Sequence, residues 1–210
     1  MLLLRGPKEK KERALGERLG LKAERSLSPK SAMVKKPYKP GQHGNNRKRG
    51  VKALSDFGLQ LKEKQKMKIS YGLSENQLVE IFKKAIKAKT NTKECLINVL
   101  ERRLDNVVFR MGLAQTRIIA RKIILDGHIS VNGRKVTFPN FQVKVKDVVS
   151  INQNSKDKTI FKNLKEKLEK YDAPIWLVVD PSILGGKISS LPVDVELPFD
   201  VNLITEFYSK

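Results

Sequence analysis

Apolar residues recur at helical spacing through the first half of the chain. Ser74 and Gln77 have the spacing of a capping box, which marks the start of a helix. The apolar residues that follow fall on one face of such a helix: Leu78, Ile81, Phe82, Ala85 and Ile86. We expect one helix before this one, over residues 55–71, and one after it, over residues 92–112. The pattern therefore predicts a helical domain.

The pattern changes in the middle of the chain. Thr116 is placed to cap a short helix over residues 117–125, and a polarity pattern typical of a strand follows. That strand ends at Asn132-Gly133, which is a strong signal for a hairpin. Valines further along supply one or two more strands. Residues 103–151 therefore predict a small domain in which helices pack against a short antiparallel sheet.

The two ends of the chain differ in composition. Residues 1–45 form a basic arm with a short helix, and they hold too few apolar side chains to order themselves alone. Residues 201–208 carry apolar side chains at helical spacing, so this last helix must dock on another part of the fold. We expect it to dock on the core around Ile81 and Phe82.

The expected fold class is α+β, with a mainly helical domain that is interrupted by the smaller one. Between the core module and the last helix we expect an amphipathic helix, a strand over residues 175–179 and a loop-rich segment over residues 181–198. The predicted domains are these: an extended basic arm, 1–45; a helical domain, 46–98 plus 199–210; and an α+β domain, 99–198.

Charge indicates the class of partner. The formal net charge is +21, which is more than solubility requires and points to a polyanion. Residues 1–150 hold 35 Lys and Arg against 13 Asp and Glu, whereas residues 151–210 hold 8 against 9. The polyanion should therefore meet the first three quarters of the chain, and the last quarter should pack internally or against protein.

The composition favours structured RNA over other polyanions. Aromatic residues make up 6% of the chain and lie mostly at core spacing, which argues against a stacking platform for single strands. Recognition through shape, phosphates and ribose hydroxyls fits better. A DNA-binding helix-turn-helix remains an alternative for the two short helices, but the basic residues extend well beyond them. A membrane-surface role would need one basic anchor, and the basic residues are spread over several segments.

No catalytic motif is present in the sequence. There is no Walker loop, no GxGxxG and no HExxH. The two histidines, His43 and His128, and the single Cys95 assemble no convincing catalytic set. We therefore expect a binding protein and not an enzyme.

Cationic and polar residues along the basic segments are the candidate RNA contacts. Arg117 and Arg121 lie one turn apart on a predicted helix, beside the predicted hairpin. The full candidate set is Arg5, His43, Arg47, Lys48, Arg49, Lys62, Lys64, Lys68, Lys83, Lys84, Arg103, Arg117, Arg121, Lys122, His128, Asn132, Arg134 and Lys135.

These residues together resemble a known family. The run RLDNVVFRMG at 103–112, followed by Thr116-Arg117, Ala120-Arg121, Gly127-His128-Ile129, Val131-Asn132-Gly133 and Pro139, is similar to the RNA-binding module named after bacterial small-subunit ribosomal protein number four. That module also occurs in pseudouridine synthases, some tRNA synthetases and a heat-shock RNA binder. Flanking segments favour the ribosomal family itself: Ser28-Pro29-Lys30, Pro40-Gly41-Gln42-His43-Gly44, Ser55-Asp56-Phe57-Gly58, Glu63-Lys64-Gln65-Lys66, Tyr71-Gly72-Leu73 and the closing Glu206-Phe207-Tyr208-Ser209-Lys210.

The resemblance implies a structural role in the small ribosomal subunit of a bacterial cytoplasm. It implies binding to 16S ribosomal RNA at a helix junction of the 5′ domain, nucleation of assembly and a contribution to translational accuracy. It implies contact with the fifth small-subunit protein and a place near the channel through which messenger RNA enters. A free RNA-binding regulator or RNA chaperone that uses the same module is the alternative.

This chain differs from many members of that family at one set of positions in the arm. Many relatives carry a four-cysteine zinc knuckle in the arm, and the corresponding positions here are Glu9, Glu12, Ser26 and Ser31. Structural zinc sites of this kind need thiolate or imidazole ligands, so this set is a poor one. We therefore expect no metal and no other cofactor.

Overall fold

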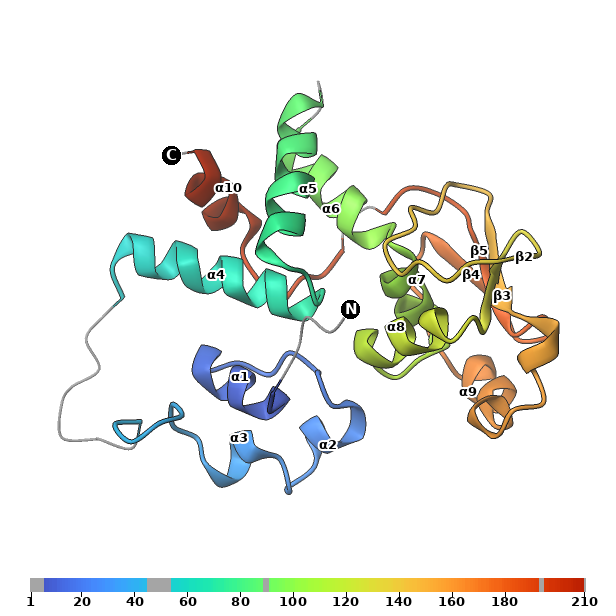
Figure 1. Ribbon diagram of the computed structural model, residues 1–210, viewed down its shortest axis with the longest axis horizontal. Helices are drawn as coiled ribbons and strands as arrows, with labels where there is room; N and C mark the ends of the chain where they lie inside the picture. Colours follow the sequence, from blue (N-terminus) through green and yellow to red (C-terminus); the bar gives the residue numbers. More distant parts are fainter. Residues whose placement is uncertain (1–5, 45–53, 89–90, 193–194, 210) are drawn as a thin grey trace. The chain divides into compact units, whose positions relative to one another are not determined.

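The computed structural model describes residues 6–44, 54–88, 91–192 and 195–209 (Figure 1). The chain forms two compact units. The helical unit comprises Met1–Cys95 and Glu196–Lys210, and the sheet unit comprises Leu96–Val195. From the sequence, we expected the two boundaries between the helical domain and the α+β domain near residues 98 and 198. The α+β class is confirmed. No helix within the described ranges is long and apolar enough to cross a membrane.

Among its described residues, the helical unit contains three short helices in the arm and three longer helices outside the arm. They are α1 (Lys8–Leu15), α2 (Ala23–Leu27), α3 (Ala32–Lys35), α4 (Asp56–Ser70), α5 (Glu75–Lys87) and α10 (Val201–Ser209). Helix α6 (Thr92–Glu101) begins in this unit and ends in the sheet unit. The arm was expected to hold one short helix, and the structure adds α2 and α3.

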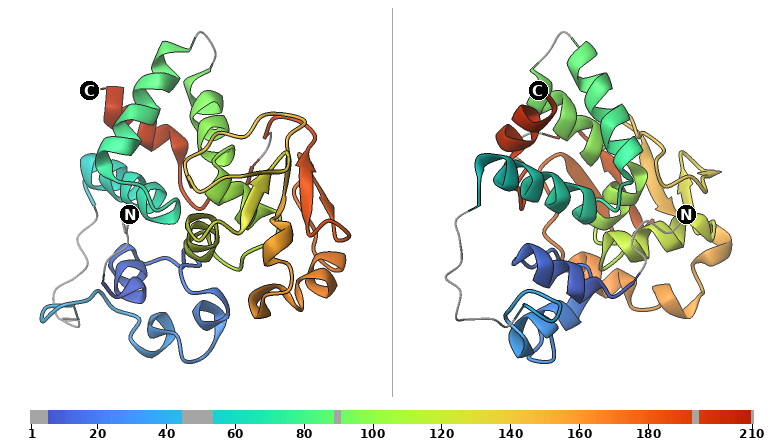
Figure 2. Two further views of the ribbon diagram at one scale, coloured as in Figure 1. Left: turned by 45° about the vertical axis from the view of Figure 1, so that its right-hand side comes forward. Right: turned by 60° about the vertical axis from the view of Figure 1, so that its left-hand side comes forward.

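The capping box and the docking of the last helix are both confirmed. The Ser74 hydroxyl accepts a hydrogen bond from the Gln77 amide, and the Gln77 side chain accepts one from the Ser74 amide. Helix α10 lies beside α4 and α5 (Figures 1 and 2), and the rings of Phe82 and Tyr208 have centroids 4.6 Å apart. Two chain segments distant in sequence thus share one core.

Glu75 joins the three long helices of this unit. Its carboxylate accepts hydrogen bonds from Lys64 at 2.6 Å, from Lys68 at 2.9 Å and from the Tyr208 hydroxyl at 3.2 Å. The Lys64 ammonium also lies 4.4 Å from the centre of the Phe207 ring. Burial alone would raise the pKa of Glu75, but the two lysines outweigh burial and lower that pKa to about 2.

The sheet unit packs its helices and strands around one apolar core. Its elements after α6 are α7 (Leu104–Arg110), α8 (Arg117–Leu125), β1 (Ile129–Val131), β2 (Arg134–Lys135), β3 (Val148–Ile151), the 3-10 helices η1 (Gln153–Ser155) and η2 (Thr159–Phe161), α9 (Leu164–Glu169), β4 (Leu177–Asp180) and β5 (Gly185–Ile188). The sheet order is β2-β1-β3-β5-β4, and every neighbouring pair is antiparallel. The cap of α8 is confirmed, because the Thr116 hydroxyl accepts a hydrogen bond from the Ile119 amide.

The hairpin predicted at Asn132-Gly133 is confirmed. Both residues have positive φ, +50° and +78°, which a two-residue type I′ turn requires. Asn132 fixes the turn further, because its side chain donates to the Asp147 carboxylate and accepts from the Val148 amide. The turn is thus tied to β3 as well as to its own strands.

One sequence-based expectation about this unit is wrong. The single helix expected over residues 92–112 is broken at Arg102 and Arg103, because the amides of Leu104 and Asp105 donate to carbonyls of the 139–141 segment and not to the preceding turn. This break arises from contacts across the fold, which local spacing does not reveal. The valines further along supply one strand, β3, as expected, and the segment around residue 143 forms only the isolated bridge of Gln142 with Arg103.

Within the described residues, the segment over residues 181–198 is loop-rich, as expected, but it also contains strand β5. This strand pairs with β3 on one side and with β4 on the other. It begins with Gly185 and Gly186, where an added Cβ would lie within 2.5 Å of backbone carbonyl oxygens on the neighbouring strands. Glycine is therefore required at this close backbone approach, and the same glycines made the segment look like a loop.

Glu75→Gln tests the acid group that joins α4, α5 and α10. A carboxylate with a lowered pKa stabilises the fold above its ordinary pKa and loses that contribution as pH falls toward 2. The wild type should therefore exceed the variant in stability at pH 6, and the difference should vanish near pH 2. Denaturant unfolding followed by far-ultraviolet circular dichroism measures it.

Glu80→Gln is the matched control, since Glu80 is exposed on the same helix. If Glu75→Gln and Glu80→Gln have the same small effect at pH 6, the carboxylate of Glu75 does not hold the helices together.

Candidate nucleic-acid interface

A buried carboxylate organises the first turn of α7. Asp105 is 2% exposed, and Arg103, 4% exposed, donates to both of its oxygens at 3.1 and 2.9 Å. Arg121, one turn into α8, donates from its Nη2 to Oδ2 of the same carboxylate at 2.5 Å. Asp105 therefore fixes the guanidinium of a buried arginine and that of a half-buried one.

The next residue, Asn106, organises a second cluster. Its side-chain amide donates to the backbone carbonyl and the carboxylate of Glu101, and its oxygen accepts from Arg117 Nε at 2.7 Å. Arg110 pairs with both oxygens of Glu101, which is fully buried. The Arg117 guanidinium also lies 4.6 Å from the centre of the Phe109 ring.

These two clusters bring four arginines together with two carboxylates: Arg103, Arg110, Arg117 and Arg121 with Glu101 and Asp105. Within the described part of the chain, these contacts join more guanidinium groups than carboxylates. Because Asp105 and Asn106 are adjacent on α7, they hold Arg121 and Arg117 on the facing side of α8 in fixed orientations. The network therefore fixes these side chains, so that little further side-chain entropy is lost when one of them makes another contact.

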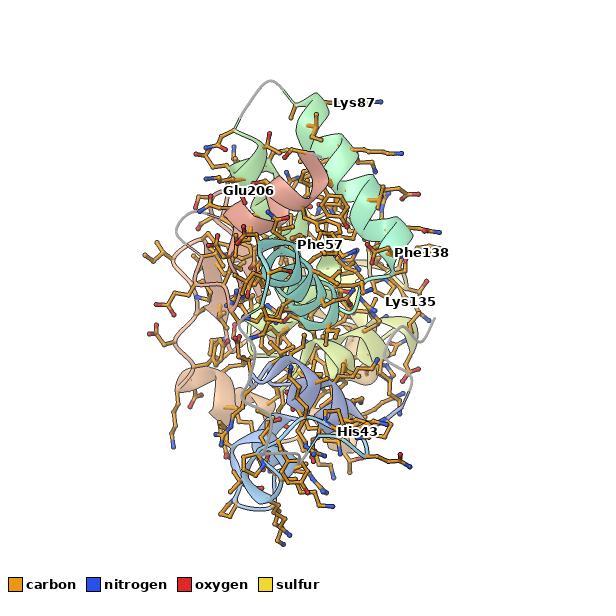
Figure 3. The ribbon with its side chains drawn as sticks, turned by 90° about the vertical axis from the view of Figure 1, so that its left-hand side faces the viewer. His43, Phe57, Lys87, Lys135, Phe138 and Glu206 are labelled. Atoms are coloured by element: carbon orange, nitrogen blue, oxygen red, sulfur yellow. The ribbon has the colours of Figure 1, made fainter. Side chains whose placement is uncertain are left out.

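The hairpin presents cations that face solvent. Arg134 and Lys135 form strand β2, and both are exposed, as is Lys122 on α8. The Lys135 side chain passes over Gly127, where an added Cβ would lie 2.1 Å from the Lys135 Cε. The end of the Lys135 side chain thus lies over the end of α8, although the residue as a whole is exposed (Figure 3).

Two candidates in the same region have structural contacts. His128 is buried, its Nδ1 lies 3.0 Å from the Ser155 hydroxyl, and its ring packs edge-on against Phe161. Burial, together with the nearby charge of Lys158, lowers the pKa of His128, so the ring is neutral at pH 7. The Asn132 side chain already forms two hydrogen bonds at the hairpin turn, one with the Asp147 carboxylate and one with the Val148 amide. Neither residue offers a positive charge to a phosphate.

The candidate lysines of the helical unit fall into two groups. Lys64 and Lys68 pair with Glu75, and Lys62 lies 3.6 Å from the Glu17 carboxylate. Lys83 and Lys84 are exposed on α5 and form no ion pair within the described part of the chain. The second group therefore has ammonium groups that are exposed and not engaged in these ion pairs.

The remaining candidates lie in the arm. His43 is exposed in the turn that ends at Gly44 (Figure 3). Four further candidates fall outside the described residues: Arg5, Arg47, Lys48 and Arg49.

Two buried glutamates hold the arm together. Glu9 accepts hydrogen bonds from Arg25 Nε at 2.9 Å and from the Ala32 amide at 3.1 Å. Glu12, fully buried, accepts the amides of Leu19 and Leu21 through one oxygen. Burial alone would raise the pKa of Glu9, but the Ala32 amide and the charges of Lys22 and Arg25 lower it. The glutamates thus tie α1 to the loops that follow.

The same contacts argue against a zinc ion at these positions. Both oxygens of Glu9 accept donors from the arm itself. The hydroxyls of Ser26 and Ser31 accept the amides of Lys22 and Met33, and neutral hydroxyls are poor zinc ligands. No group of three or more His, Cys, Asp or Glu side chains with a geometry fit for a metal ion occurs among the described residues.

Sequence reasoning missed the acidic partners of the arginines. Glu101, Asp105 and Asn106 flank a helix break, and their spacing carries no mark of an ion-pair network. It missed Arg110 for the same reason. Only the contacts across the fold reveal these partners.

The fold and the outward cations define a basic α+β nucleic-acid-binding protein. Comparison with known families agrees with this class. Residues 4–101 match the ribosomal protein S4/S9 N-terminal domain, and residues 102–149 match the S4 domain.

Comparison with individual proteins extends over the whole chain. The small ribosomal subunit protein uS4 of Caldicellulosiruptor bescii is 44% identical over 98% of each chain. The uS4 protein of Acetivibrio thermocellus is 45% identical over 93% of each chain, and so is the uS4A protein of Alkaliphilus metalliredigens. The chain belongs to the uS4 family of small-subunit ribosomal proteins, which are not enzymes.

Asp105→Asn tests the buried network. The substitution leaves the buried Arg103 charge without a counter-charge, and breaking a buried pair in this way costs about 3–5 kcal/mol of unfolding free energy. Denaturant unfolding followed by the fluorescence of Trp176, which lies in the core of the sheet unit, measures the loss.

Asp126→Asn is the control, because Asp126 is exposed at the end of α8. A loss below about 1 kcal/mol for Asp105→Asn, equal to that of the control, would mean that the network does not support the fold.

Proposed function

We propose that this chain is a structural component of the small ribosomal subunit and binds small-subunit ribosomal RNA. The similarity to uS4 proteins over almost the full chain carries the proposal. The exposed cations on α8 and β2 support it, because phosphate contacts supply most of the affinity for nucleic acid. The sparse aromatic residues favour structured RNA, which is read by shape.

The finer role follows from the family resemblance. The proposed target is a helix junction in the 5′ domain of 16S ribosomal RNA, bound early so that the chain nucleates assembly. The proposed neighbours are the fifth small-subunit protein and messenger RNA near the channel through which it enters, at a contact that influences accuracy. The two units suit such a junction, since each presents its own exposed lysines: Lys83 and Lys84 on one, Lys122 and Lys135 on the other.

The alternative is a free RNA-binding regulator or chaperone. The match of residues 102–149 to the S4 domain alone would fit either function. The match of residues 4–101 to a ribosomal domain favours the subunit component. Sucrose-gradient fractionation separates the two: the chain should sediment with small subunits, and a mainly free pool would favour the regulator.

We also propose that the arm folds without zinc. The carboxylates of Glu9 and Glu12 accept donors from α2, from α3 and from the loop at residues 19–21, which are the segments that a metal would otherwise join. The Lys22 and Arg25 side chains supply the positive charge near Glu9 that a zinc ion would supply.

Removal of cations from the hairpin should weaken RNA binding in a salt-dependent way. Arg134→Gln with Lys135→Gln removes two phosphate contacts, so the slope of log K against log salt for a 5′-domain transcript should decrease in magnitude by about 1–2. Filter binding between about 0.05 and 0.3 M salt measures that slope.

Lys167→Gln with Lys170→Gln is the matched control for charge, because both lysines are exposed on or next to α9. Equal slopes for the two double variants would show that the hairpin makes no particular contact.

Substitution of Glu12 should loosen the arm without any metal being involved. Glu12→Leu removes the acceptor for the Leu19 and Leu21 amides, so these amides should exchange with deuterium at least tenfold faster. Glu12→Gln keeps one acceptor oxygen and should retain most of the protection.

Metal analysis of the purified protein accompanies that exchange experiment. We expect no stoichiometric zinc, and we expect a chelator to leave the exchange rates of the wild type unchanged. Stoichiometric zinc, or loss of protection on chelation, would contradict the proposed role of the two glutamates.

A further inference from the structure

The sheet unit contains a shallow cavity of about 450 Å³ away from the hairpin. It lies among the segments around η2, the start of α9 and the turn between β4 and β5. Its lining residues are Lys156, Asp157, Phe161, Lys162, Lys165, Pro181, Ser182 and Leu184. All of them follow residue 149, so they lie outside both matched family domains.

The rim of this cavity is basic. Lys156, Lys162 and Lys165 line it, and none of the three forms an ion pair within the described part of the chain. Among the described residues of the lining, Asp157 is the single acidic one. Three unpaired ammonium groups around one concave surface repel one another unless an anion neutralises them, so the site is suited to an anionic ligand.

The apolar lining residues, which we call the floor of the cavity, are Phe161, Pro181 and Leu184. The Phe161 ring is 2% exposed and is held edge-on by His128. The β4–β5 turn forms one wall, and Asp180 holds it by accepting hydrogen bonds from both the amide and the hydroxyl of Ser182. Those two hydrogen bonds also lower the pKa of Asp180, so the acid stays ionised and the turn stays formed.

We propose that this lysine-rimmed cavity is a second contact for the ribosomal RNA backbone, in which Lys156, Lys162 and Lys165 bind phosphate oxygens and the apolar floor receives the ribose. The inference rests on the proposed function. The size of the cavity fits one nucleotide unit of a backbone, and ammonium groups bind phosphates as point charges without a fixed geometry. It assigns RNA contact to the last quarter of the chain, where the overall charge balance predicts protein contact.

Two double variants with the same charge change test the site. Lys162→Gln with Lys165→Gln removes two rim charges, and Lys167→Gln with Lys170→Gln removes two exposed charges from the same segment outside the lining. With a 5′-domain transcript, the rim variant should reduce the magnitude of the salt slope by about 1–2, and the control variant should change it clearly less. Lys162→Arg with Lys165→Arg keeps the charge and should restore the slope.

The possible outcomes separate this proposal from the one on which it rests. If the wild type binds the transcript without salt dependence, or not at all, the proposed function fails. If the wild type binds normally but the rim and control variants have equal slopes, only the cavity proposal fails. Trp176 fluorescence unfolding of all variants excludes a folding defect, because Trp176 lies in the core of the same unit.

Discussion

The buried carboxylate of Asp105 is the constraint on which the geometry of the sheet unit depends. It binds the buried Arg103 and the α8 residue Arg121 at once, directly after the break between α6 and α7. A charge in an apolar interior is tolerated only with a close counter-charge and satisfied hydrogen bonds. The position of α8 on α7, and hence of the hairpin that follows α8, is therefore set by this ion pair as much as by apolar packing.

The same principle divides the cations of this strongly basic chain into two sets. One set forms ion pairs within the fold: Lys64 and Lys68 pair with Glu75, and Lys66 pairs with Glu17 and Glu63. The other set is exposed on α5, α8 and β2. These acidic residues thus have a structural role, since they neutralise the cations that are buried, whereas the outward cations remain exposed to solvent.

Much of the fold was predictable because its signals are local. The capping box at Ser74, the helix cap at Thr116 and the Asn132-Gly133 turn depend on residues close in sequence. The parts that could not be predicted depend on distant partners. Strand β5 exists only because β3 and β4 lie on either side of it, and the break in the predicted helix exists only because the 139–141 segment supplies acceptors.

The candidate site shows the same limit. Residue type marked Arg103, Lys64 and His128 as possible phosphate contacts, but burial and internal partners decide which cations face outward. The sequence shows which residues are charged but not which of them are exposed. The family resemblance indicates the class of partner but not which cations face solvent. The net charge of the last 60 residues likewise concealed the lysines gathered around one cavity.

Amine-reactive footprinting with and without 16S ribosomal RNA tests the division of cations most directly. Lys64 and Lys66 should react slowly in both states, because they are buried in ion pairs. Lys122 and Lys135 should react readily in the free chain and become protected when RNA is bound. Equal reactivity of Lys122 and Lys135 in the free and bound states, or RNA-dependent protection confined to Lys64 and Lys66, would contradict the account.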